Sequence, residues 1–346
     1  MSGLSPDDAT IGILIIGVLL FTYSILGSID FGAGFWAMLY GRGRETRASE
    51  LANRYLSPTW KVTNVFLVLF VVALVGFFPR AMYVLASLLL VPVCLVLILL
   101  TVRSTFMVFA YSADKYRGLL RVVSGITGML IPALLVSVLP TTLGGFIVMT
   151  PDGPQLDYGR LLSSPTEYAH LAFGFASELF LAALFLADYA REAEDEAAYA
   201  VYRRASLLLG PLTLMTAVLV TYTMVPEAQW IVAKLERQVP LFGLSVAAFA
   251  LGYTALFWHA GGGRIGRPRL AIVLVIAQYA SASFAYGRAH YPYIVYPIMT
   301  IEEGFTNKLM FQSLLIGYTL GALVMVPSFI LFWRLFLKDK RYLRQE

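Results

Sequence analysis

Two acidic residues lie inside apolar stretches that are long enough to cross a lipid bilayer. Asp30 lies within ILGSIDFGAGFW, residues 25–36, and Glu178 lies near the middle of the apolar segment 168–189. An ionisable group at membrane depth is costly, so it usually faces a protein interior or a water path and serves ion pairing or proton transfer. Asp30 and Glu178 are therefore the two candidates for a proton path. A structural ion pair for Asp30 and a purely structural role for Glu178 stay open as alternatives.

A second polar patch follows in PTWKVTNVFLVLF, residues 58–70. Trp60 is typical of a side chain that anchors a helix at the membrane interface. Asn64 favours a hydrogen bond to another helix. For Lys61 three roles are open, namely snorkelling to the interface, pairing with Asp30, and contact with acidic lipid. These three residues are secondary candidates, as polar or helix-contact residues.

The composition is that of a membrane protein. Hydrophobic residues make up 59% of the 346 residues, charged residues 14%, and the mean hydropathy is +0.74. Cys94 is the only cysteine, which excludes disulfides within the chain and thiolate metal clusters. Three histidines, at 170, 259 and 290, lie near the ends of three different segments. No metal-binding His pair, phosphate loop or dinucleotide motif is present, so no cofactor or metal is assigned to this chain.

Nine apolar segments are predicted to be transmembrane helices, because each is near the roughly 20 residues that a helix needs to cross the hydrocarbon core. The fold class is therefore an all-α membrane protein. The segments are 10–40, 62–79, 81–102, 119–140, 168–189, 206–225, 240–259, 269–288 and 310–333.

The distribution of basic residues predicts the orientation. Of the 26 Lys and Arg residues, 19 border alternate connections or the C-terminal tail, and Arg103 is counted among them. The positive-inside rule then puts the N-terminus outside and the C-terminus in the cytoplasm. This topology explains the net charge of +5 without a nucleic-acid partner.

The segments group into two four-helix bundles plus one peripheral helix, because short connections make sequential helices neighbours. The expected parts are a first bundle over 1–140 and an extracytoplasmic connection over 141–167, which is an ordered cap or a flexible loop. A second bundle covers 168–288. Residues 289–346 contain an outer loop, the ninth peripheral helix and a basic cytoplasmic tail.

Several stretches together resemble subunit II of the cytochrome bd-type quinol oxidases. They are ILGSIDFGAGFW, SPTWKVTNVFLVLF, GFFPRAMY and SGITGMLIPALL, while SPTEYAHLAFGFASELFLAALFLADYARE and AHYPYIVYP are similar to the bacillus-type variant. The resemblance implies a nine-helix subunit in the bacterial cytoplasmic membrane, paired with a homologous subunit I that carries haem b and haem d. It also implies oxidation of quinol, reduction of dioxygen to water with protons from the cytoplasm, and in some members a small single-helix accessory subunit. The type of quinol, the presence of haem d or only haem b, and a structurally bound lipid or quinone stay open.

The resemblance also sharpens the question about Asp30. Asp30 matches the family's acid in the first helix, near a proposed proton route from the cytoplasm to the haems. The residue after Trp60 is commonly acidic in the family, and here it is Lys61. We therefore expect either a proton relay through Asp30 or an ion pair between Asp30 and Lys61.

Two other classes of function remain as alternatives to a proton-conducting oxidase subunit. One is a secondary transporter with acids at the membrane midplane, which predicts broken helices and related repeats in the two halves. The other is a structural scaffold in which every polar residue serves helix contacts.

Overall fold

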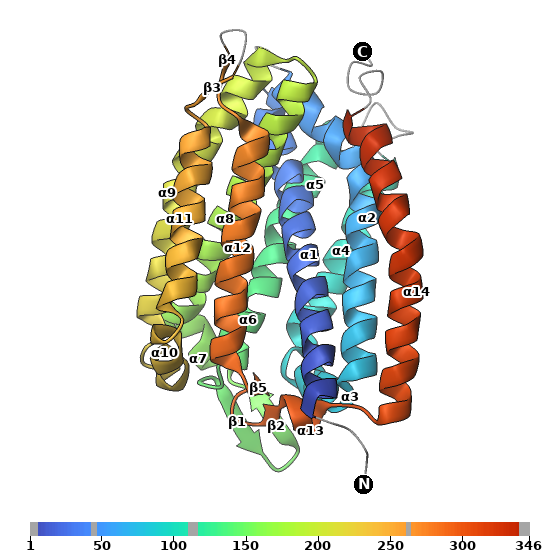
Figure 1. Cartoon of the computed structure of the whole chain (residues 1–346), viewed down its shortest axis with the longest axis vertical. Coiled ribbons are helices and arrows are strands. Elements are labelled where there is room, and N and C mark those ends of the chain that lie inside the picture. The colour runs from blue at the N-terminus through green and yellow to red at the C-terminus, as the bar shows by residue number, and fades with distance from the viewer. Residues whose placement is uncertain (1–5, 43–46, 110–116, 261–263, 339–346) are drawn as a thin grey trace.

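The computed structural model describes residues 6–42, 47–109, 117–260 and 264–338, and its long helices run side by side along one axis (Figure 1). The long helices are α1 (Pro6–Leu39), α2 (Ala48–Phe77), α4 (Leu90–Phe109), α5 (Arg117–Val136), α8 (Pro165–Glu192), α9 (Glu196–Thr223), α11 (Val239–Ala255), α12 (Pro268–His290) and α14 (Lys308–Phe332). Shorter helical elements are η1 (Tyr40–Arg42), α3 (Pro79–Leu88), α6 (Val138–Thr142), α7 (Tyr158–Ser163), α10 (Gln229–Glu236), α13 (Ile301–Gly304) and η3 (Trp333–Lys338). Three small antiparallel hairpins pair β1 (Ile147–Thr150) with β2 (Gly153–Leu156), β3 (His259–Ala260) with β4 (Arg264–Ile265), and β5 (Tyr293–Val295) with β6 (Met299–Thr300).

The described residues contain eight helices that are long and apolar enough to cross a membrane. A ninth span results if α10 and α11, which are bent by 73° at a short break, are counted as one crossing. The chain is thus a multi-pass α-helical membrane protein, and the predicted nine segments agree with the upper count.

The helix α2 begins at Ala48, well before the predicted start at residue 62. Its first four turns are too polar to be detected by hydropathy, yet Ala48, Ala52 and Leu56 recur every four residues and are all buried. This spacing places one apolar stripe against the core.

The predicted segment 81–102 is not one helix. The chain forms α3, turns at Leu89, and continues as α4 as far as Phe109. Arg103 therefore lies inside a helix, and its assignment to a cytoplasmic connection was wrong. The sequence STFMVF after Arg103 is apolar enough to continue the span, which explains the later end.

The connection 141–167 is an ordered cap. Its residues form the end of α6, the β1–β2 hairpin and α7, at the end of the molecule where α1 begins (Figure 1). The Ser164 side chain then accepts a hydrogen bond from the backbone of Thr166 and caps the N-terminus of α8. The cap thereby defines where α8 enters the bundle.

The helix α1 packs against α2, α5 and α8, and α8 also packs closely against α9. Small residues allow these approaches. A Cβ atom added at Gly32 would lie 2.5 Å from the Cβ of Ala182, so α1 and α8 are in direct backbone-to-side-chain contact there. This confirms that Gly32 serves helix packing.

The helix α14 lies at the edge of the bundle, beside α2 (Figure 1). Within α14 only Phe311 is buried, and the Tyr318 hydroxyl donates a hydrogen bond to the Leu69 carbonyl on α2 at 2.8 Å. The last helix is thus peripheral, as expected.

Candidate functional site

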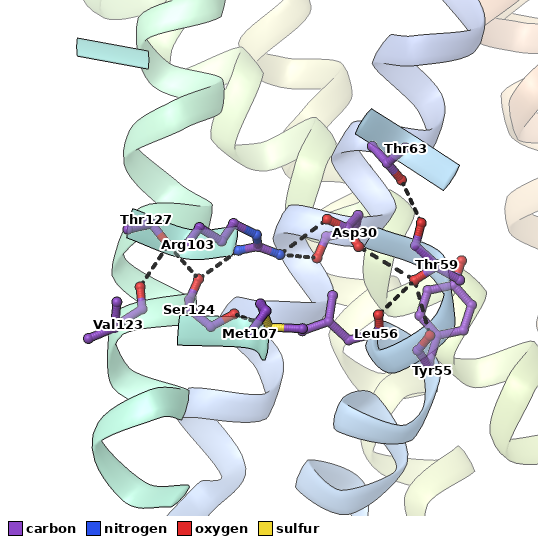
Figure 2. A network of polar contacts seen from close by, with 10 residues as sticks. All are labelled: Asp30, Tyr55, Leu56, Thr59, Thr63, Arg103, Met107, Val123, Ser124 and Thr127. Carbon is purple, nitrogen blue, oxygen red and sulfur yellow. Dashed lines mark hydrogen bonds and ion pairs between the residues drawn. The ribbon is translucent and has the colours of Figure 1, made fainter. Parts of the chain in front are cut away.

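Asp30 forms a buried ion pair with Arg103. The guanidinium of Arg103 on α4 donates to the Asp30 carboxylate at 3.2 Å and to the Asp30 main-chain carbonyl at 3.1 Å, as Figure 2 shows. Each residue is only 3% exposed. Because two charges are costly to bury separately, the pair compensates both of them within the apolar core.

Further contacts hold both partners in place. Arg103 also donates to the Ser124 carbonyl on α5 at 2.8 Å, and its guanidinium lies 4.9 Å from the centre of the Phe31 ring. On the other side, the Thr59 hydroxyl on α2 lies 3.4 Å from the second carboxylate oxygen of Asp30 (Figure 2). The network joins four helices, α1, α2, α4 and α5.

Two glycines make room for the Arg103 side chain. A Cβ at Gly34 on α1 or at Gly128 on α5 would lie 3.1 Å from an Arg103 nitrogen. At Gly128 the added atom would also come within 2.6 Å of the Phe31 carbonyl oxygen. The small residues around Asp30 therefore accommodate a cation as well as neighbouring helices.

Glu178 lies on α8, on the side that faces α1. A Cβ at Gly32 would lie 2.9 Å from the Glu178 carbonyl oxygen and 3.4 Å from its Cγ atom. Glu178 is 1% exposed, and neither carboxylate oxygen has a hydrogen-bond partner among the described residues. On α1, Gly32 lies against Glu178, and Gly34, two residues further along, lies against Arg103. The site therefore holds two buried acids and one buried cation in the part of the chain that is described.

The secondary candidates lie outside this network. Lys61 is exposed, and its Nζ atom lies 5.7 Å from the ring centre of its neighbour Trp60. The hypothesis of an ion pair between Asp30 and Lys61 was wrong, because Arg103 holds the Asp30 carboxylate. The Trp60 Nε1 atom is buried without a hydrogen-bond partner among the described residues, and Asn64 is half-buried.

Arg103, Thr59 and Ser124 were not among the predicted site residues. The available signal was Arg103 itself, a lone basic residue followed by the six apolar or small polar residues 104–109. Its partner could not be read from the sequence, since Asp30 is 73 residues away.

The histidines do not converge on one point. His170 and His290 are buried, and each Nδ1 atom contacts a backbone carbonyl, of Thr166 at 2.7 Å and of Tyr293 at 2.8 Å. His259 lies in β3, at the opposite end of the helices from His170. The described residues contain no group of three or more His, Cys, Asp or Glu side chains that could hold a metal ion.

The buried carboxyl groups can hold and exchange a proton. A carboxyl group with no fixed partner, such as that of Glu178, can gain or lose a proton without breaking a hydrogen bond or an ion pair. Asp30 differs, because Arg103 and Thr59 fix its orientation. Fold and site together define a multi-pass helical membrane protein with a buried acid–guanidinium pair and a second buried acid on an adjacent helix.

The comparisons with known proteins identify the family. The model of the family described as cytochrome bd terminal oxidase subunit II matches residues 9–336. The chain belongs to this family. It is therefore one subunit of an oxidoreductase complex, and its family implies a partner subunit I.

Two relatives cover nearly the whole chain. A putative cytochrome bd menaquinol oxidase subunit II of Bacillus subtilis (strain 168) is 45% identical over 341 residues, which cover 98% of each chain. A chain in the structure of bd oxidase from Geobacillus thermodenitrificans is 37% identical, with a TM-score of 0.82, and the match covers 96% of this chain and 100% of that chain. The family membership confirms the resemblance seen in the sequence and gives no support to a secondary transporter.

Proposed function

We propose that this chain is the haem-free subunit II of a bacterial quinol:oxygen oxidoreductase and that it carries part of a proton path to the oxygen-reducing site. The observation that carries this proposal is the buried carboxyl group of Glu178, which has no hydrogen-bond partner among the described residues and lies on a helix packed against that of Asp30. Full-length similarity to subunit II proteins supports the assignment to the oxidase.

The partner in this proposal is a homologous subunit I that binds haem b and haem d. The three histidines of this chain lie on separate elements, α8, β3 and α12, and we assign the haems to subunit I because the resemblance to subunit II of this family implies it. The B. subtilis relative is named a menaquinol oxidase subunit, and we propose menaquinol as the quinol substrate of the complex.

The proposed topology places the N-terminus outside and the C-terminus in the cytoplasm of a bacterial cytoplasmic membrane. The first four-helix group would consist of α1, α2, α4 and α5 within residues 1–140, and the second of α8, α9, α11 and α12 within 168–288. The connection 141–167 would face the outside, and the region 289–346 would hold the peripheral α14 and the basic tail. We also propose that the complex contains a small accessory subunit and a bound lipid or quinone.

In the proposed path, a proton reaches Asp30 from the cytoplasmic side, and Glu178 receives it next. Arg103 keeps the Asp30 carboxylate oriented and compensates its charge. No side chain that the structure describes donates a hydrogen bond to the Glu178 carboxylate, so a proton can bind there without breaking one. The scaffold alternative differs in one respect, since it requires no proton transfer through either acid during turnover.

An absorption spectrum of the complex that co-purifies with this chain tests the assignment. Haem b and haem d bands are expected in the complex, and none is expected when the chain is produced alone. Absence of haem bands from the native complex would exclude the oxidase role. Haem bands in the chain alone would contradict the haem-free assignment.

A further inference from the structure

A cleft opens between α2 and the C-terminal end of α14. Its walls come from α1, α2, α8 and the C-terminal end of α14, and its volume is about 20 Å³, which is room for about one water molecule. The outer wall contains Phe332 and Trp333, whereas Thr59 and Thr63 contribute the polar atoms of α2. The cleft is lined by Leu26 of α1, and the C-terminal ends of α1 and α14 lie at the same end of the molecule (Figure 1).

The inner wall of this cleft contacts the acid site directly. The Thr59 hydroxyl lies 3.4 Å from the Asp30 carboxylate, and Thr63 lies one helical turn further along α2 (Figure 2). The Thr63 hydroxyl donates to the Thr59 carbonyl at 3.3 Å. A single hydroxyl therefore separates Asp30 from a space that is open at one side.

The Thr59 hydroxyl has a choice of acceptors. Its oxygen lies 3.0 Å from the Tyr55 carbonyl, 3.3 Å from the Leu56 carbonyl and 3.4 Å from the Asp30 carboxylate. A hydroxyl carries one proton and two lone pairs, so only one of these contacts is donated at a time. The proton can rotate from a carbonyl of α2 to the carboxylate of Asp30.

We propose that this cleft is the water entrance of the chain and that Thr59 passes protons from it to Asp30. In the transfer, an excess proton from the cytoplasm reaches the cleft as a hydronium ion, the Thr59 hydroxyl oxygen accepts that proton as it gives its own to the carboxylate, and a neutral water and an unchanged threonine are left. The inference rests on the proposed function, because it supplies the entrance to the path through Asp30. It also gives Lys61 no part, since that side chain does not line the cleft.

Cysteine labelling tests whether the cleft is wet. In the complete oxidase carrying Cys94→Ser, a Val62→Cys variant places a thiol in the cleft wall. Val65→Cys is the matched control, because Val65 lies on the same helix, is exposed, and does not line the cleft. A charged, membrane-impermeant methanethiosulfonate is added to open membranes, and modification of this chain is read by mass spectrometry. Modification of the Val62→Cys variant at least tenfold faster than the control is expected, and equal or slower modification overturns the wet cleft.

Turnover of the complete oxidase tests the transfer. Thr59→Val removes the hydroxyl at nearly constant volume, and Val62→Trp fills the cleft. Each is expected to slow oxygen consumption at least fivefold with haem bands unchanged, and Thr59→Ser is expected to keep the parental rate. Val65→Trp is the control for the added ring.

Asp30→Asn separates the two proposals. If Asp30→Asn slows turnover per haem in a complex of parental haem content while Thr59→Val and Val62→Trp do not, the entrance is overturned and the proton path through Asp30 stands. If Asp30→Asn keeps the parental rate in a fully assembled oxidase, the proton path fails, and the labelling result then decides only whether the cleft is wet.

Discussion

Arg103 donates hydrogen bonds to both the side chain and the main-chain carbonyl of Asp30, at 3.2 and 3.1 Å, from a helix 73 residues later in the sequence. This double contact fixes α4 against α1 at one height and leaves the second carboxylate oxygen of Asp30 to Thr59. The pair is therefore a packing constraint as well as an electrostatic one. Its two consequences, for assembly and for proton transfer, can be tested separately.

The first prediction concerns the ion pair. Arg103→Met leaves Asp30 buried without its cation, and removal of one partner of a buried pair costs about 3–5 kcal/mol. We expect loss of the assembled complex, measured by haem content after purification and by thermal unfolding in detergent. The double variant Asp30→Asn with Arg103→Met removes both charges, and it should recover much of the lost stability. A double variant that is as unstable as the sum of the single ones would contradict the pairing.

Lys61 provides the second prediction. Because its side chain is exposed and does not contact Asp30, Lys61→Glu should change thermal stability by less than about 0.5 kcal/mol. Oxygen consumption should also stay at the parental rate. A large drop in turnover with normal assembly would show that a positive charge at this helix position takes part in the path.

Glu178→Gln tests the unpartnered acid. The substitution keeps the shape of the side chain, and no hydrogen bond or ion pair to a described residue is lost, so the complex should assemble with normal haem content. Turnover should fall about tenfold or more, because an amide cannot carry the proton, and this corresponds to about 1.4 kcal/mol or more in the activation free energy. Glu236→Gln, at an exposed position on α10, is the matched control. Parental turnover for Glu178→Gln would favour the scaffold alternative.

The contact between α1 and α8 gives the fourth prediction. In Gly32→Ala the new Cβ would meet the Ala182 Cβ at 2.5 Å and the Glu178 carbonyl at 2.9 Å, so the helices have to separate. Overpacking of this kind costs about 1–3 kcal/mol. Thermal unfolding of the purified complex measures the cost. Gly243→Ala on α11, where an added Cβ meets no atom within 4 Å, should be neutral or slightly stabilising.

Hydropathy and helix signals predicted the spans well and their ends poorly. The polar start of α2 escaped detection, because its buried stripe shows in the spacing of apolar residues and not in the mean hydropathy. The extension of α4 also escaped detection, because the predicted segment was ended at its first charged residue, Arg103. The same error assigned Arg103 to a connection and so removed the natural partner of Asp30 from consideration. Lys61 was then expected to be the partner, because Asp30 and Lys61 lie near the cytoplasmic ends of adjacent predicted helices.

The sequence by itself determined the class of protein, its helical spans and the two acids, because apolar runs of about 20 residues and acids within them need no knowledge of the partner helix. Motifs spread over the chain also indicated the family. Only the tertiary structure decided that Asp30 belongs to Arg103, that Glu178 has no partner among the described residues, and that a cleft reaches Thr59. The physical reason is that a buried charge is compensated by whichever group the packing brings within hydrogen-bond distance, and helix packing here depends on small residues such as Gly32, Gly34 and Gly128.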